Sequence, residues 1–217
     1  MARRPGRPRA SGDPDGERDT RRDVLDAAAA LFCTVGFTST STRAIADAAG
    51  VRQASIYHHF AGKDAILLEL LLGTVRPSLD LADALVAGTE PAAARLWALV
   101  HADVGLLGAG PVNLGVLYVL PEVAGEQFAE FHALRSRLRS RYAELAAAAA
   151  DHADDDRGEL VLGLVESVIL RRRDTPDLDV AAVQDAVADG VLRLVGCTPT
   201  EVAAARALPV SLGVGAI

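Results

Sequence analysis

Residues 38–63 read TSTSTRAIADAAGVRQASIYHHFAGK, and this stretch decides the fold of the N-terminal part of the chain. Its run of small hydroxyl residues suits the N-cap of a short helix, which Gly50 then ends in a tight turn. A second short helix is expected over about residues 53–60. Apolar residues at helical spacing close a core between the two helices: Ile45, Ala46, Ala49, Val51, Ile56 and Phe60. The stretch therefore predicts a helix-turn-helix.

The second of these helices carries a polar face suited to reading DNA bases. The residues on or near that face are Arg52, Gln53, Ser55, His58 and His59. An Arg side chain can pair with guanine and a Gln side chain with adenine in the major groove, and Tyr57 adds a hydroxyl on a rigid ring. The alternative is a plain three-helix bundle in which these polar residues are merely solvated.

Residues 36–70, GFTSTSTRAIADAAGVRQASIYHHFAGKDAILLEL, resemble the N-terminal DNA-binding module of the TetR family of transcriptional regulators. The family pattern is matched without a gap at Gly36, Phe37, Thr40, Ser41, Ile45, Ala46, Gly50, Val51, Ile56, Tyr57, Phe60 and Lys63. The resemblance extends over roughly residues 18–70. It implies a regulator that places its second short helix, the recognition helix, in the major groove.

Carried over by position, the resemblance implies a set of DNA contacts around the recognition helix. These are Thr40, Thr42, Arg43, Arg52, Gln53, Ala54, Ser55, Tyr57, His58, His59 and Lys63. Tyr57 and Lys63 are expected at phosphates. Two positions depart from the family pattern, because Arg52 stands where a Ser or Thr cap is common and Ala44 stands where an acid is common. The recognition helix is therefore expected to lack its usual side-chain cap.

The charge of the chain is divided between its two ends. Residues 1–63 carry ten basic and seven acidic residues, whereas residues 64–217 carry 12 basic and 22 acidic residues, within a total of −7. A basic N-terminal part can neutralise phosphates while an acidic remainder repels DNA. Residues 1–17 are expected to form a flexible basic arm. Its Gly-Arg-Pro core resembles a minor-groove AT-hook, and the alternative is a tail that adds only non-specific affinity.

The rest of the sequence predicts an all-α fold. Half of the residues are hydrophobic but only 4% are aromatic, which favours helices packed on helices. The helix from Lys63 is expected to end near Val75, because Pro77 forbids its uninterrupted continuation. Further helices are expected near residues 79–87, 91–107, 112–120, 125–151, 157–173 and 179–196. The predicted domains are a basic arm (1–17), a DNA-binding domain (18–63), a helical effector-binding and dimerisation domain (64–207) and a flexible tail (208–217).

The resemblance implies that the C-terminal part binds a ligand and forms a homodimer. The helices near 157–173 and 179–196 are the predicted dimer contact, since the first is apolar nearly all round between Leu160 and Leu170. A two-fold dimer suits a palindromic operator. Polar or aromatic residues inside apolar helices are the candidate ligand contacts: Trp97, His101, Asn113, Tyr118, Phe128, His132 and Glu166.

Each of these candidates has an alternative. A lone polar group among apolar residues is often simply hydrogen-bonded within the core. Glu166 could line a pocket, pair with Arg171 or Arg172 at the dimer interface, or be exposed. Four arginines that alternate along one helix are expected on a solvated surface: Arg135, Arg137, Arg139 and Arg141.

No enzyme, cofactor or metal site is predicted. The sequence has no glycine-rich phosphate loop, no serine elbow and no histidine pair at metalloprotease spacing, and adjacent His58 and His59 point to different sides of a helix. Cys33 and Cys197 are expected as inert core thiols. The uncharged stretch 104–121 holds glycines, prolines and Asn113, so it predicts a buried, broken helix rather than a membrane span.

Together these features predict a cytoplasmic, ligand-responsive regulator, a repressor that a small apolar effector releases from its operator. The N-terminus has no apolar run of the kind that a secretory signal needs. The alternative is a DNA-binding protein of the same fold that acts without an effector, as an activator or as a nucleoid or division factor.

Overall fold

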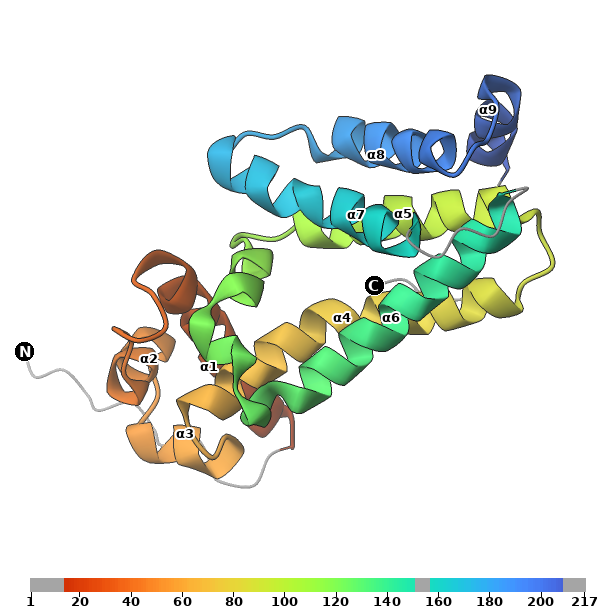
Figure 1. Ribbon diagram of the computed structural model, residues 1–217. Coiled ribbons are helices and arrows are strands. Elements are labelled where there is room, and N and C mark those ends of the chain that lie inside the picture. The colour runs from red at the N-terminus through yellow and green to blue at the C-terminus, as the bar shows by residue number, and fades with distance from the viewer. Residues whose placement is uncertain (1–13, 151–156, 209–217) are drawn as a thin grey trace, which may run out of the picture. The chain divides into compact units, whose positions relative to one another are not determined.

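The computed structural model describes residues 14–150 and 157–208 (Figure 1). The predicted arm up to residue 13, the acidic stretch 151–156 and the tail after residue 208 lie outside this range. Every regular element within it is helical, which confirms the prediction of an all-α fold. The chain divides into two compact units, residues 1–67 and residues 68–217.

The first unit holds three helices and the start of a fourth. These are α1 (Pro14–Thr34), α2 (Thr42–Ala49), α3 (Gln53–His59) and the first residues of α4 (Lys63–Ala87). Its core contains four of the apolar residues expected from the sequence, Ile45, Ala46, Ile56 and Phe60, packed with Val24, Ala28 and Phe32 of α1. The other two expected residues, Ala49 and Val51, are half-buried. The expectation that the arm extends to residue 17 is wrong, because α1 already begins at Pro14. Proline is favoured in the first turn of a helix, where its missing N–H costs nothing.

The expected break at Pro77 is wrong as well, since α4 continues through it to Ala87. An interior proline removes one backbone hydrogen bond and costs about 3 kcal/mol. Apolar residues on both sides of Pro77 are buried, among them Val75 at 2%, Leu79 at 4% and Ala82 at 0% exposure. Because each buried aliphatic side chain contributes about 1.5–3 kcal/mol, this packing outweighs the cost of the proline.

The second unit is organised around α5 (Ala92–Gly108). It packs against α6 (Ala129–Ala149), α7 (Arg157–Asp174), α8 (Val180–Leu194) and α9 (Pro199–Ala207). Arg95 of α5 also donates to the Leu85 and Val86 carbonyl oxygens of α4. In Figure 1, α7 and α8 run beside each other, and they are in contact. Large buried side chains such as Leu96, Leu99, Phe131 and Tyr142 form the core of the unit.

Residues 104–121 form a broken helix, as their sequence indicates. Helix α5 ends at Gly108, and three 3-10 turns follow: η1 (Leu114–Val119), η2 (Pro121–Ala124) and η3 (Glu126–Phe128). The expected helices 112–120 and 125–151 are thus corrected to 3-10 turns and to α6 beginning at Ala129. A Cβ atom on Gly115 would lie 2.5 Å from the Cδ1 atom of Ile169. The glycine therefore lets η1 approach α7 closely.

The structure contains a helix, α9, that was not among the helices predicted from the sequence. The hydroxyl of Thr198 accepts a hydrogen bond from the Glu201 backbone N–H, while the Glu201 carboxylate accepts one from the Thr198 backbone N–H. This is a capping box, and Pro199 follows at the first helical position. Thr-Pro-Thr-Glu was therefore a readable signal for a helix start.

The two cysteines are not core residues. Both Cys33 and Cys197 are half-buried, which corrects the expectation of fully packed thiols. Burial, together with the nearby charge of Glu201, raises the pKa of the Cys197 thiol.

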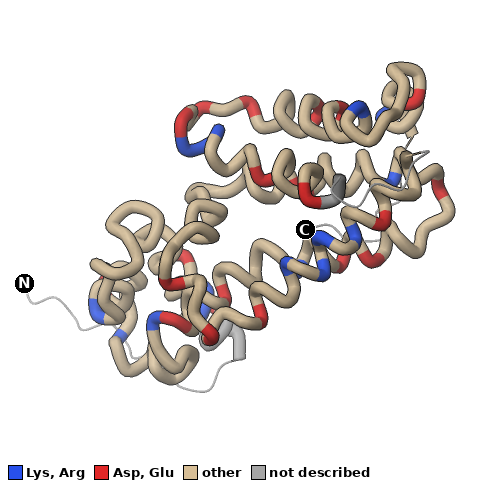
Figure 2. Tube along the Cα trace, viewed as in Figure 1, with Lys and Arg blue, Asp and Glu red and all other residues tan. Residues whose placement is uncertain are grey.

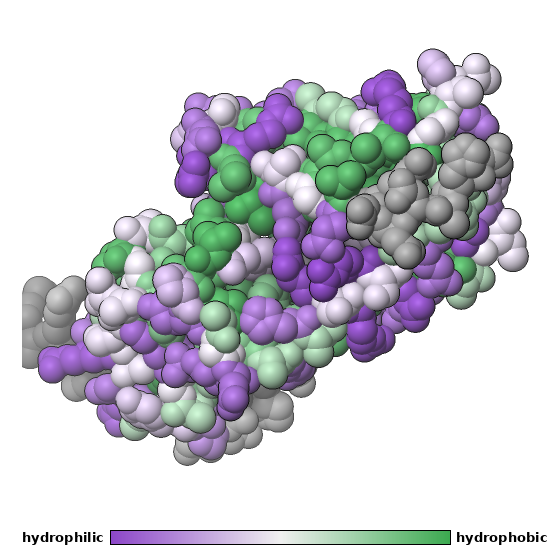
Figure 3. Space-filling model, in the orientation of Figure 1, coloured by the Kyte–Doolittle hydropathy of each residue, from purple (hydrophilic) through white to green (hydrophobic). Residues whose placement is uncertain are grey.

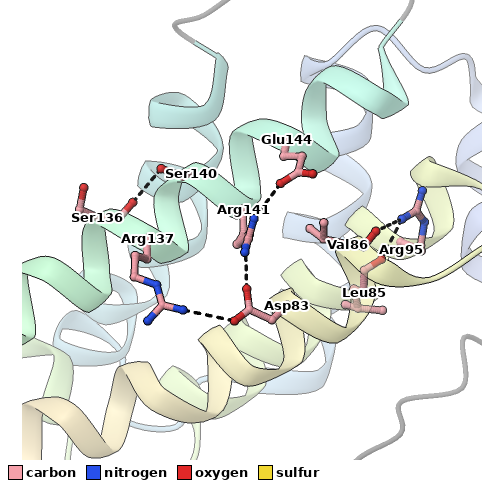
Figure 4. Close-up of polar contacts among 9 residues, drawn as sticks. All are labelled: Asp83, Leu85, Val86, Arg95, Ser136, Arg137, Ser140, Arg141 and Glu144. Carbon is pink, nitrogen blue, oxygen red and sulfur yellow. Dashed lines mark hydrogen bonds and ion pairs between the residues drawn. The ribbon is translucent and has the colours of Figure 1, made fainter.

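The four alternating arginines of α6 are paired rather than merely solvated. Arg137 and Arg141 approach the two carboxylate oxygens of Asp83 on α4, at 3.5 and 2.6 Å (Figure 4). Arg139 pairs with Glu159 on α7 at 3.1 Å, and Arg135 pairs with Glu166. Figure 2 shows basic positions along α6 beside acidic positions of neighbouring helices. Exposed pairs of this kind stabilise a protein by only about 0–1 kcal/mol each.

A search of the helices within residues 14–150 and 157–208 finds none that is long and apolar enough to cross a membrane.

Candidate nucleic-acid interface and effector cavity

The helix-turn-helix of the first unit is held by two local devices. The Ser41 hydroxyl accepts a hydrogen bond from the Ala44 backbone N–H at 3.1 Å and so caps α2. At the other end Gly50 has φ +68°, and its N–H reaches the carbonyl oxygens of Ala46 and Asp47. This left-handed conformation is open to glycine and strained for other residues. Helix α3 then begins after Arg52, which makes no side-chain cap, as the sequence indicates.

Replacing Gly50 by Ala is expected to lower the free energy of unfolding by about 1–2 kcal/mol, because a Cβ atom at positive φ clashes with its own backbone. The matched control is Gly73→Ala, at a helix-interior glycine of α4 with nothing within 4 Å of the added Cβ. This change should instead stabilise by roughly 0.5–1 kcal/mol. Urea unfolding followed by circular dichroism measures both, and equal signs for the two variants would contradict the role given to Gly50.

The outer face of α3 is polar and open. Arg52, Gln53, Ala54, Tyr57 and His58 are exposed, whereas Ser55 and His59 are half-buried. Tyr57 is 55% exposed although Ile56 beside it is fully buried. Helix α3 therefore has one face buried in the core and one exposed face that is accessible to a large partner.

A hydrogen-bonded group links α3 to the start of α2. The Gln53 amide Nε2 donates to the Thr42 hydroxyl at 3.1 Å, and that hydroxyl lies 3.2 Å from the Tyr57 hydroxyl. Arg43, the next residue of α2, is exposed. Three of the predicted contacts, Thr42 of α2 and Gln53 and Tyr57 of α3, therefore lie together on the surface of the unit.

Two of the predicted DNA contacts, Thr40 and Lys63, also hold the turn between α1 and α2. Thr40 is 3% exposed, and its hydroxyl donates to the Gly36 carbonyl at 2.7 Å. The Lys63 ammonium donates to the carbonyl oxygens of Phe37 and Thr40, at 2.6 and 2.9 Å, and lies 4.3 Å from the centre of the Phe37 ring. These interactions tie residues 37–40 to the start of α4, a role that local spacing in the sequence does not reveal.

The second unit contains a cavity of about 460 Å³ between η1, α6 and α7. It brings together three of the predicted ligand contacts, Tyr118, His132 and Glu166. Apolar side chains form much of the remaining wall: Val116, Val119, Phe131, Ile169 and Leu170. An apolar cavity with a few convergent polar groups is the usual form of a small-molecule site.

The other four ligand candidates do not line this cavity. Trp97 stacks on His101 with ring centres 4.7 Å apart, and its Nε1 donates to Asp189 on α8 at 2.9 Å. The Asn113 amide Nδ2 donates to the Ile169 carbonyl at 2.8 Å. Phe128 is fully buried. In the structure these side chains join elements of the same unit to one another.

Arg135 is a cavity residue that the sequence analysis assigned to the solvated surface. Its Nε and Nη2 atoms donate to one oxygen of Glu166 at 2.9 and 2.6 Å, and Nη2 also reaches the other oxygen at 2.5 Å. Glu166 is thus a cavity residue paired with Arg135, and Arg172 donates instead to carbonyl oxygens of residues 107–112. The ion pair depends on which helices meet, so no signal within α6 alone could have revealed it.

A buried carboxylate lies behind the cavity, and the sequence analysis missed it. Asp103 on α5 is 3% exposed, and the Tyr142 hydroxyl donates to its Oδ2 at 2.6 Å. Burial raises the pKa of Asp103 from 3.8 to about 6, although hydrogen bonds from Ser78 and Tyr142 act in the opposite direction. The readable signal was a lone acid within the apolar run LVHADVGLLG.

Comparison with known proteins agrees with this geometry. The model for "Bacterial regulatory proteins, tetR family" matches residues 24–70. The crystal structure of AmtR from Mycobacterium smegmatis superposes with a TM-score of 0.78 and 45% identity, over 93% of this chain and 96% of that one. The transcriptional repressor KstR2 of Rhodococcus jostii is 32% identical over 134 residues, which are 61% of this chain and 66% of that protein.

The match to KstR2 of Mycobacterium tuberculosis is shorter, with 46% identity over 59 residues that span 30% of that protein. The structure of the same regulator has a TM-score of 0.68 at 23% identity, a likeness of fold. The resemblance stated from the sequence is confirmed, as is the prediction of a regulator rather than an enzyme. The chain belongs to the TetR family of bacterial regulatory proteins.

Proposed function

We propose that the protein is a homodimeric transcriptional repressor that binds a palindromic operator and leaves it when a small effector enters the cavity of the second unit. The observation that carries the DNA-binding part is the exposed polar face of α3 above fully buried Ile56. A chain with this face can offer Arg52 and Gln53 to base edges and Tyr57 to a phosphate. Because its target is chromosomal DNA, we place the protein in the cytoplasm.

An apolar surface on α7 and α8 supports the homodimer. Leu160, Leu164 and Leu170 of α7 are 55%, 38% and 53% exposed, and Leu194 of α8 is 37% exposed. Figure 3 shows hydrophobic side chains gathered over these two helices. A contiguous apolar surface of this kind marks an interaction site. A second copy that packs its own α7 and α8 there would bury both surfaces about a two-fold axis.

The cavity of about 460 Å³ supports the effector response. It lies within the size range of small-molecule sites, and three of its residues were predicted as ligand contacts from the sequence. An effector can release the protein from its operator only if it binds the conformation that does not bind DNA more tightly than the conformation that does. Helix α4 contains residues of both units, from Lys63 to Ala87, and we propose it as the element that transmits the change.

The DNA-binding part is tested by selecting duplexes from a random pool and titrating salt on the best site. Wild type should select a palindrome and bind it with steep salt dependence. Arg52→Ala should weaken binding roughly tenfold and relax one base position, whereas Tyr57→Phe should weaken all sites alike. The control is Arg139→Ala, which removes the same charge from an exposed ion pair of the second unit. Selection of no site, or wild-type binding by both variants, would overturn the proposal.

The effector response is tested separately, by thermal-shift screening of lipophilic compounds followed by operator release. A bound effector stabilises the folded protein by RT ln(1 + [L]/Kd), so it raises the melting temperature. Compounds that do so should also lower operator affinity. Operator binding that no compound affects would favour the same fold acting without an effector.

A further inference from the structure

We propose that the effector is an amphipathic carboxylate whose anionic group binds the Arg135 guanidinium in competition with Glu166, while its apolar body fills the rest of the cavity. This inference rests on the proposed effector site and names the class of molecule that it takes. The starting observation is that a two-pronged arginine–carboxylate pair forms part of a cavity wall that is otherwise largely apolar.

The charged side chains around the cavity favour an anion. Those that line it are Arg135 and Arg173, which are basic, and Glu166, which is acidic. Arg135 pairs with Glu166, and the Arg173 Nε atom donates to the Asp174 carboxylate at 2.8 Å, so both lining arginines already have a carboxylate partner. An incoming anion therefore has two guanidinium groups in the cavity wall with which it can pair, whereas an incoming cation has Glu166 alone among the lining residues.

Arg135 is already oriented for a carboxylate. Its guanidinium presents Nε and Nη2 to Glu166, and its central carbon lies 5.8 Å from the centre of the Tyr118 ring. A planar guanidinium fork matches a carboxylate in two parallel hydrogen bonds, and a fork held by an aromatic ring loses little freedom on binding. The Glu166 carboxylate thus occupies the position that a ligand carboxylate would take.

The apolar part of the cavity fits the body of such a molecule. Val119 lines the cavity, yet it is 81% exposed. An apolar chain or ring in the cavity would cover this side chain, and each square ångström of apolar surface removed from water contributes about 25 cal/mol. The contact between the ligand carboxylate and Arg135 would orient the ligand, and burial of its apolar body would contribute to its affinity for the cavity.

The buried acid Asp103 does not compete for the same position. It lines a separate chamber of about 20 Å³, in which Tyr118, Arg135 and Glu166 also take part. That volume is close to the space needed by a single water molecule. Its oxygens accept hydrogen bonds from Tyr142 and Ser78. The ligand anion therefore meets Arg135 from the larger cavity.

Two matched sets of probes test the proposal on the full-length protein. They are octanoate, 1-octanol and octylamine, and 3-phenylpropionate, 3-phenylpropanol and 3-phenylpropylamine. Calorimetric affinity and release of the selected operator are measured for each. At least one carboxylate should bind about tenfold or more tightly than its alcohol and amine, since hydrogen bonds to charged groups contribute about 1.5–3 kcal/mol. The same carboxylate should release the operator.

Variants of the ion pair give opposite expectations. Arg135→Gln should weaken carboxylate binding about tenfold, and Glu166→Gln should strengthen it severalfold because the competing carboxylate is gone. Arg139→Gln is the matched control, since it breaks another α6–α7 ion pair, Arg139–Glu159, whose residues do not line the cavity. It should bind carboxylate as wild type does. The Glu166→Gln gain keeps the test decisive if Arg135→Gln folds poorly.

The contrary outcomes separate this inference from the proposed function. Tighter binding of an amine, equal binding of an alcohol, or unaltered binding by Glu166→Gln would overturn the carboxylate assignment. Failure of both carboxylates to bind would also overturn the carboxylate assignment. If a different compound nevertheless releases the operator, the proposed effector response still stands. If no compound of any class releases operator, the effector response itself fails.

Discussion

Asp103→Asn is expected to stabilise the protein at pH 7.5, by up to about 3 kcal/mol in the free energy of unfolding. Burial raises the pKa of this carboxyl from 3.8 to about 6. At neutral pH Asp103 is therefore ionised, although its buried site favours the protonated form. One pKa unit corresponds to about 1.4 kcal/mol. An asparagine carries no charge, and its Oδ1 can still accept the hydrogen bond from the Tyr142 hydroxyl.

The sign of the pH dependence follows from the two pKa values of Asp103. Between pH 3.8 and about 6 the folded state binds the proton more tightly than the unfolded state does. The contribution of Asp103 to stability is therefore fully present below pH 3.8 and is lost as the pH rises through 6. In wild type this group lowers the free energy of unfolding between pH 5 and 7, and in Asp103→Asn that fall should vanish.

Urea unfolding at half-unit steps from pH 5 to 7.5 measures the difference between the two proteins. The matched control is Asp83→Asn, which removes a half-exposed carboxylate that pairs with Arg137 and Arg141. It should lower stability by no more than about 1 kcal/mol, the opposite sign. A lower stability of Asp103→Asn than of wild type at pH 7.5 would show that hydrogen bonds fully compensate the buried charge.

The sequence predicts the helix-turn-helix well because that motif depends on short-range rules. The cap at Ser41, the left-handed turn at Gly50 and the buried Ile45 and Ile56 are separated by only a few residues each. The roles of Thr40 and Lys63 are different, because they arise where the turn after α1 meets the start of α4. A pattern of spacing assigns such residues to a surface without showing which neighbour they face.

The second unit was harder to predict for the same physical reason. A polar residue on an apolar helix face indicates burial, but its partner comes from another helix. Tyr118 and Glu166 therefore meet in the cavity, whereas Trp97 and its neighbour His101 contact α8. Helix α4 shows the related limit that packing can outweigh a helix breaker such as Pro77. Local preference predicts an element, and only the packed unit determines its length.

Leu164→Arg is expected to separate the proposed homodimer into monomers. Leu164 is 38% exposed near the middle of α7, with Leu160 one turn before it at 55% exposure. An arginine at a two-fold contact places a charge, or two charges related by the axis, in an apolar interface that cannot solvate them. Sedimentation equilibrium should then give the mass of one chain, whereas wild type should give the mass of two.

Loss of the dimer should lower affinity for the full palindrome by roughly 100-fold or more, because two linked recognition helices gain that much from effective concentration. Affinity for a single half-site should stay unchanged, since α3 lies in the other unit and keeps its exposed face. The comparison of the full palindrome with the half-site therefore distinguishes loss of the dimer from loss of folding. The control is Ala84→Arg, which adds the same charge at an exposed position of α4 and should stay dimeric. A Leu164→Arg protein that remains dimeric and binds the palindrome as wild type does would place the dimer contact outside α7, and the exposed leucines of that helix would then need another partner.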